Sequence, residues 1–187
     1  MAKSIWGDLP PFTIKALPAR KEAAAPTSMQ AQQVLSEIGQ NALALNALEM
    51  EKQRLKPLFK GFNPAHISPK ALGEAGMLLF KLGFIDNLTA DLMSRTGAEF
   101  DAQGKVLNVE QPINALEFLA NRIAQMKERT QWGDRYAETL LPDYVRTIHV
   151  MQNLQAFAES GDSYEMLKIK AQERNGKRAP TPTPKLP

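Results

Sequence analysis

The chemically most suggestive stretch of the chain is a turn rich in oxygen ligands, placed between two segments of helical spacing. Asp101, Gln103 and Gly104 lie together there. A calcium loop needs oxygen ligands at its first, third and fifth positions, glycine at the sixth and glutamate at the twelfth. Counting from Asp101 puts Lys105 at the fifth position and Pro112 at the twelfth. Because a cation among the ligands repels Ca²⁺, the sequence predicts no calcium site.

Nitrogen ligands are scarce, since the chain has two histidines and no cysteine. His66 and His149 are not at helical spacing, and neither belongs to a His-Glu-x-x-His pattern of a zinc enzyme. We expect surface or half-buried histidines, with no metal and no cofactor. The absence of cysteine also excludes disulfides and thiol nucleophiles.

Three carboxylates, Glu74, Glu99 and Asp101, fall near the predicted turn. Two acids that flank a cleft would suit a hydrolase, but no spacing in the sequence fixes a pair. The chain has no glycine-rich phosphate loop and no Gly-x-Ser-x-Gly or Ser-x-x-Lys motif, and its serines suit helix caps. We therefore predict a protein that is not an enzyme and keep a carboxylate-dependent hydrolase as an alternative.

A basic cluster near the end of the chain is the remaining chemical signal. It consists of Lys168, Lys170, Arg174, Lys177 and Arg178. Such a cluster can contact nucleic-acid phosphates, so a nucleic-acid-associated protein is a second alternative. No aromatic residue follows Tyr164, however, and no recognition-helix pattern is evident. A solubilising tail explains the cluster at least as well.

The charge of the chain is unevenly distributed. The net charge of the 187 residues is +3, but residues 1–26 carry +2 and residues 168–187 carry +5. Residues 27–167 hold 13 basic and 17 acidic side chains, a net charge of −4. A basic core for nucleic acid is therefore not indicated. No apolar run is long enough for a signal peptide or a membrane span, so we expect a cytoplasmic protein.

Hydrophobic spacing predicts an all-α bundle of five to seven helices over residues 27–172. Leu and Ala recur at helical steps, and Ser68-Pro69, Asp86 and Asp134 are typical helix starts. A small β-hairpin is predicted within residues 99–109. The helices are expected at residues 28–56, 68–82 (the most buried one), 87–95, 112–127, 134–141 and 142–160, with a last segment that Asp162 caps. Leu48 and Leu88 are expected on inward faces.

The two ends have the composition of extended or disordered tails. Residues 1–26 contain four prolines together with the apolar residues Trp6, Leu9 and Phe12, and residues 173–187 are basic and rich in proline. The apolar residues of the first tail either fold back onto the domain or dock on a partner, since an exposed tryptophan is unfavourable.

These features together predict a protein–protein interaction module: an adaptor, regulator, chaperone or accessory subunit. It would bind another protein through an apolar helix face, with Trp6, Leu9 and Phe12 and the basic cluster as secondary contacts. A helical core between extended ends also suits bacterial secretion or phage assembly, by analogy of fold alone. The sequence indicates neither the partner nor the oligomeric state.

Overall fold

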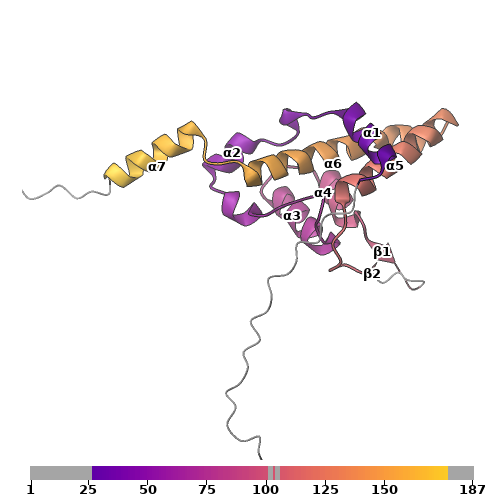
Figure 1. The fold of residues 1–187 in the computed structure, drawn as a ribbon, viewed down its shortest axis with the longest axis horizontal. Helices are drawn as coiled ribbons and strands as arrows, with labels where there is room; N and C mark the ends of the chain where they lie inside the picture. The colour runs from indigo at the N-terminus through magenta and orange to yellow at the C-terminus, as the bar shows by residue number, and fades with distance from the viewer. Residues whose placement is uncertain (1–26, 101–102, 104–105, 177–187) are drawn as a thin grey trace, which may run out of the picture.

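The structure, a computed structural model, describes residues 27–100, 103 and 106–176 (Figure 1). The fold is all-α, as predicted, with seven α-helices and two short 3₁₀ helices in this part of the chain. The α-helices are α1 (Met29–Ile38), α2 (Ala47–Lys52), α3 (Pro69–Lys81), α4 (Asn87–Arg95), α5 (Ala115–Gln131), α6 (Arg135–Glu159) and α7 (Tyr164–Gly176). The 3₁₀ helices are η1 (Ala42–Ala44) and η2 (Lys56–Phe59).

Helix α6 is the centre of the bundle. In Figure 1 it runs along the long axis of the molecule, and α5, α4, η1 and η2 pack on it along its length. Helix α1 packs on α5, and α3 packs on α4. One apolar core joins these elements, with Ile148, Met151 and Leu154 of α6 fully buried in it.

Helices α3 and α4 form a tight antiparallel pair whose ends were readable from the sequence. Ser68 caps α3 with Pro69 at the first helical position, and Asp86 caps α4. The chain leaves α3 through a pair of backbone hydrogen bonds, from Gly83 to Phe80 and from Phe84 to Leu79, which satisfies the last carbonyl groups of the helix.

The predicted hairpin is present in short form. Strands β1 (Glu99–Phe100) and β2 (Val106–Leu107) pair antiparallel, with Glu99 opposite Leu107. The turn residues predicted at Asp101 and Gly104 lie outside the described residues. A second antiparallel contact joins Ile67 to Ile113, whose N–H groups each donate to the other residue's carbonyl at 3.0 and 2.9 Å.

The single long helix predicted over residues 28–56 is wrong. Helix α1 ends at Gly39, which has a φ of +64°, and the chain continues through η1 and α2. Carbonyl groups exposed by this break accept hydrogen bonds from α6: His149 Nε2 donates to Ile38 at 3.2 Å, and Asn153 Nδ2 donates to Asn41 at 2.7 Å. The break is thus stabilised by a helix more than 100 residues further along the chain.

The two proline boundaries were also misplaced. Pro142 was expected to separate two helices but lies inside α6, where seven residues precede it. Pro112 was expected to start α5, but Asn114 caps that helix and accepts a hydrogen bond from the backbone of Glu117 at 3.0 Å. The backbone of Ile113 pairs with that of Ile67, so the helix begins after Ile113.

Other expectations about burial and capping need correction. Helix α3 is not the most buried helix, because its Met77 and Phe80 remain exposed and α4 has the larger share of buried residues, four of nine against four of thirteen. Leu48 and Leu88 are also exposed rather than inward. Ser163, not Asp162, caps α7, since its hydroxyl accepts a hydrogen bond from the backbone of Met166 at 3.3 Å.

Helix α7 extends away from the bundle in Figure 1 and continues to Gly176, past the predicted start of the tail at residue 173. No helix in the described part of the chain is long and apolar enough to cross a membrane.

Candidate docking groove

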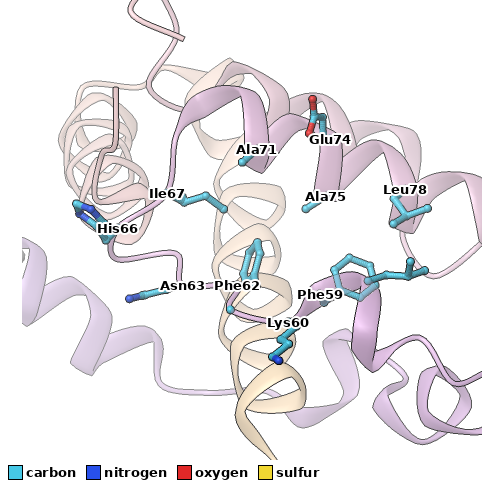
Figure 2. Close-up of a pocket in the computed structure, with 12 residues that line it drawn as sticks. Phe59, Lys60, Phe62, Asn63, His66, Ile67, Ala71, Glu74, Ala75 and Leu78 are labelled. Atoms are coloured by element: carbon cyan, nitrogen blue, oxygen red, sulfur yellow. The ribbon is translucent and has the colours of Figure 1, made fainter. Parts of the chain in front are cut away.

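An open hollow of about 370 Å³ lies between α3 and the segment that leads from η2 to Ile67 (Figure 2). We call it the α3 groove. Its apolar lining residues are Leu58, Phe59, Phe62, Ile67, Ala71, Ala75 and Leu78, and its polar ones include Lys60, Asn63, His66 and Glu74. Residues from two stretches of the chain thus form one apolar surface with polar groups around it.

Small side chains create the hollow. Ala71 and Ala75 are one helical turn apart, so they lie on the same side of α3 and leave space above the backbone. Phe59 and Phe62 point toward this side of α3 from across the groove (Figure 2). Both phenylalanines are buried and belong to the core, which makes the wall that they form a rigid one.

The end of the groove near His66 is fixed by backbone hydrogen bonds. Ile67 is held by its pairing with Ile113, and the carbonyl of Pro64 accepts a hydrogen bond from Ala115 at 2.8 Å. Asn63 stabilises the turn that precedes them, because its side chain accepts a hydrogen bond from the backbone of Ala65 at 3.0 Å. This end of the groove is therefore attached to the start of α5.

The opposite end is open and apolar. Leu58 is 61% exposed there, although it is the third residue of a short helix whose last residue, Phe59, is buried. An apolar middle with charged groups on the rim is the usual composition of a protein-binding pocket. Lys60 and Glu74 provide one charge of each sign on this rim.

The residues considered for chemistry are not gathered in the groove. Glu74 is exposed on its rim, while Asp101 and the side chain of Glu99 lie outside what the structure describes. His149 is bound to the end of α1, far along the chain from His66. Among the described residues, no three His, Asp or Glu side chains are grouped so that they could hold a metal ion. The hydrolase alternative gains no support and stays a prediction.

A polar cluster fixes the start of α7 to α2 and η2. Glu51 is nearly buried, and its carboxylate accepts a hydrogen bond from the backbone of Ser163 at 2.8 Å. Lys56 lies 3.4 Å from the same carboxylate oxygen, donates to the carbonyl of Gly161 and faces the ring of Phe157. The hydrogen bond from Ser163, with Lys56 adding to it, lowers the pKa of Glu51 below its ordinary value.

A second hollow, of about 500 Å³, lies between α2 and the end of α6. Glu51, Lys56 and Ser163 of the polar cluster line it. Because the Glu51 carboxylate is already bound to Lys56 and to the backbone of Ser163, we assign this hollow to the positioning of α7 rather than to a ligand.

The basic residues predicted to contact a partner differ in whether they form an ion pair within the described part of the chain. Lys168 and Arg174 are exposed on α7, and no ion pair of either is seen within the described residues. Lys170 instead pairs with Asp162 at 2.6 Å, which stabilises the helix itself. Lys177 and Arg178, like Trp6, Leu9 and Phe12 of the first tail, lie outside the described residues.

Sequence reasoning missed an aromatic pair at the turn between α5 and α6. Trp132 is 84% exposed and Tyr136 is 70% exposed, on either side of Gly133. Tryptophan and tyrosine are enriched where proteins bind one another. The sequence indicates this exposure, because Trp132 directly precedes Gly133. A residue beside a glycine that ends a helix usually lies away from the core. Both side chains are exposed at a turn, in contrast to the buried phenylalanines that form a wall of the α3 groove.

Comparison with known protein families, curated proteins and solved structures finds no match to this chain.

Proposed function

We propose that this protein is a non-enzymatic docking protein, an adaptor or accessory subunit, whose α3 groove binds an apolar segment of another protein. The observation that supports this most directly is the groove itself: apolar side chains line a pre-formed hollow whose walls belong to the core. A concave site with apolar walls and a few polar groups at its edge is the usual form of a binding pocket.

The shape of the groove favours a helix or an extended segment as its ligand. It follows one side of α3 past Ala71, Ala75 and Leu78, a distance of about two helical turns. Helix-in-groove recognition uses apolar side chains at steps of three and four residues, which fit a hollow of this length. We therefore propose a partner segment that presents two or three large apolar residues, such as Leu, Phe or Trp.

A photo-crosslinking amino acid placed at position 71 tests this proposal in cells of the source organism. Ala71 is exposed and lines the groove, whereas Met77 is exposed on the same helix and does not. The proposal predicts a discrete adduct with one other protein from position 71 and a much weaker one from position 77. Equal adducts from both positions, or none from position 71, would contradict it.

Nucleic-acid binding through α7 is a second candidate. It is favoured by one observation, namely that Lys168 and Arg174 project from a helix that extends away from an otherwise acidic body. The exposed Leu167 and Ile169 on the same helix fit a protein partner better, so we rank this candidate second.

A further inference from the structure

The first described residues, Thr27 and Ser28, are held at the start of α5, close to one end of the α3 groove. Thr27 is held by α5, since Asn114 Nδ2 donates to its hydroxyl at 3.3 Å. The backbone of the next residue, Ser28, donates to the Glu117 carboxylate at 2.9 Å. Residues 1–26 are therefore attached to the body at the start of α5.

This attachment lies beside the end of the groove that His66 and Ile67 form. Asn114 stands between Ile113, which pairs with Ile67, and Ala115, which donates to the carbonyl of Pro64. Thr27, the first described residue, is thus held next to one end of the groove, by a residue whose chain neighbours bind the groove segment.

Residues 1–26 contain large apolar side chains of the kind that an apolar groove binds. Their large apolar residues are Ile5, Trp6, Leu9, Phe12, Ile14 and Leu17. Pro10 and Pro11 stand between Leu9 and Phe12 and disfavour a helix there, so the segment would lie in the groove in extended form. The segment carries a net charge of +2, against −4 for residues 27–167, so its charge complements that of the body.

The connecting chain is long enough. The residues between Phe12 and Thr27 could span about 45 Å if extended and about 20 Å if helical. Helix α3 has 13 residues and is itself about 20 Å long. Trp6 and Phe12 can therefore reach any part of the groove in either conformation.

We propose that residues 5–17 occupy the α3 groove of their own chain, with Trp6 and Phe12 as anchors, and that a partner binds by displacing them. This inference rests on the proposed function, because it assumes that the groove binds an apolar segment. A short flexible connection gives an effective concentration of about 1 mM. A segment that binds with a Kd of about 0.1 mM as a free peptide would then be docked in cis about ten times as often as it is free.

Tryptophan fluorescence of the full chain tests this inference. The sequence has two tryptophans, so Trp132→Phe leaves Trp6 as the single emitter. Trp132 is exposed at a turn, which makes this replacement harmless to the core. Ala71→Arg places a long charged side chain in the groove, and Met77→Arg is the matched control on another side of α3.

The inference predicts that Trp6 in the Trp132→Phe chain is shielded from acrylamide and emits at a shorter wavelength than in a peptide of residues 1–26. Adding Ala71→Arg should make quenching rise several-fold toward that of the peptide, while Met77→Arg leaves it unchanged. Circular dichroism shows whether each variant is folded, and Ala75→Gln replaces Ala71→Arg if that variant is not.

Two results would overturn the inference. If acrylamide quenches Trp6 in the full chain as strongly as in the peptide, the segment does not dock in the groove. The proposed function would then still be decided separately, by crosslinking from position 71. Shielding that is lost on dilution, together with a dimer mass by light scattering, would show that the segment docks on a second copy instead.

Discussion

Glu51 is one of the residues that fix the position of α7. Its carboxylate is nearly buried and joins α2 to the first turn of α7 through the backbone of Ser163. A buried carboxylate of this kind stabilises the fold only while it is ionised.

The lowered pKa of Glu51 gives a testable pH dependence. Because the folded pKa lies below the ordinary value of 4.5, the stabilisation is complete above pH 4.5 and is lost as the pH falls through the folded pKa. Glu51→Gln should therefore lower the melting temperature at pH 7, with a difference from the parent protein that shrinks toward pH 3. A difference that is the same at both pH values would contradict this role.

Gly97 is a position where the backbone requires glycine and where the space beside it is tight. Its φ is +72°, and a Cβ there would collide with Cδ1 of Ile113. Gly97→Ala should lower the free energy of unfolding by about 1–3 kcal/mol for backbone strain, with a further loss from the collision. Gly83→Ala is the control, because Gly83 has a φ of +79° and open space around it. Urea denaturation should show a larger loss at position 97, and equal losses would contradict the collision.

At the scale of helices, three capped starts were predictable, whereas the starts expected at Pro112, Pro142 and Asp162 and the break after α1 were not. Ser68, Asp86 and Asp134 cap helices at the predicted places, because a cap depends on side chains within three residues. The break after α1 depends instead on His149 and Asn153 of α6, which no local pattern reveals. The break could not be predicted from the sequence, because the hydrogen bonds that replace those of the helix come from residues distant along the chain.

The same limit explains why the α3 groove was not predicted. Ala71 and Ala75 look like ordinary helix formers in the sequence, and Phe59 and Phe62 look like part of a linker. The groove exists because the pairing of Ile67 with Ile113 helps to hold that linker against α3. The apolar helix face was predicted, but its position was not.

Pro142 provides a test of how α6 tolerates an internal proline. A proline in a helix removes one backbone hydrogen bond and disfavours the helix by about 3 kcal/mol relative to alanine. Pro142 is exposed, so its replacement by alanine disturbs no core contact. Pro142→Ala should raise the free energy of unfolding by up to about 3 kcal/mol in urea denaturation. A decrease would show that the proline is required for the geometry of α6.

At the scale of the whole molecule, the protein combines an acidic body with basic ends. This distribution of charge, rather than the pI of about 9.1, determines which charged partners each part of the protein can bind. The aromatic residues at Trp132, the α3 groove and α7 are separate surfaces, and each offers an exposed residue for substitution, namely Trp132, Ala71 and Lys168.

The nucleic-acid candidate can be tested on the full chain through α7. Replacing Lys168 and Arg174 by glutamate should abolish any binding to a labelled oligonucleotide, and binding by the parent protein should weaken steeply with salt. Lys170, which pairs with Asp162, is left in place so that the helix is preserved. Binding that is absent in the parent protein, or unchanged in the double variant, would remove this candidate.

The central claim is that the α3 groove binds an apolar segment of another protein. The most direct test is the affinity of the partner identified by crosslinking, measured by titration calorimetry for the parent protein, Ala71→Arg and Met77→Arg. Blocking the centre of a docking site removes about 2 kcal/mol or more, so Ala71→Arg should weaken binding by at least about 30-fold, with Met77→Arg close to the parent protein. Equal affinity of the parent protein and a folded Ala71→Arg variant would contradict the claim.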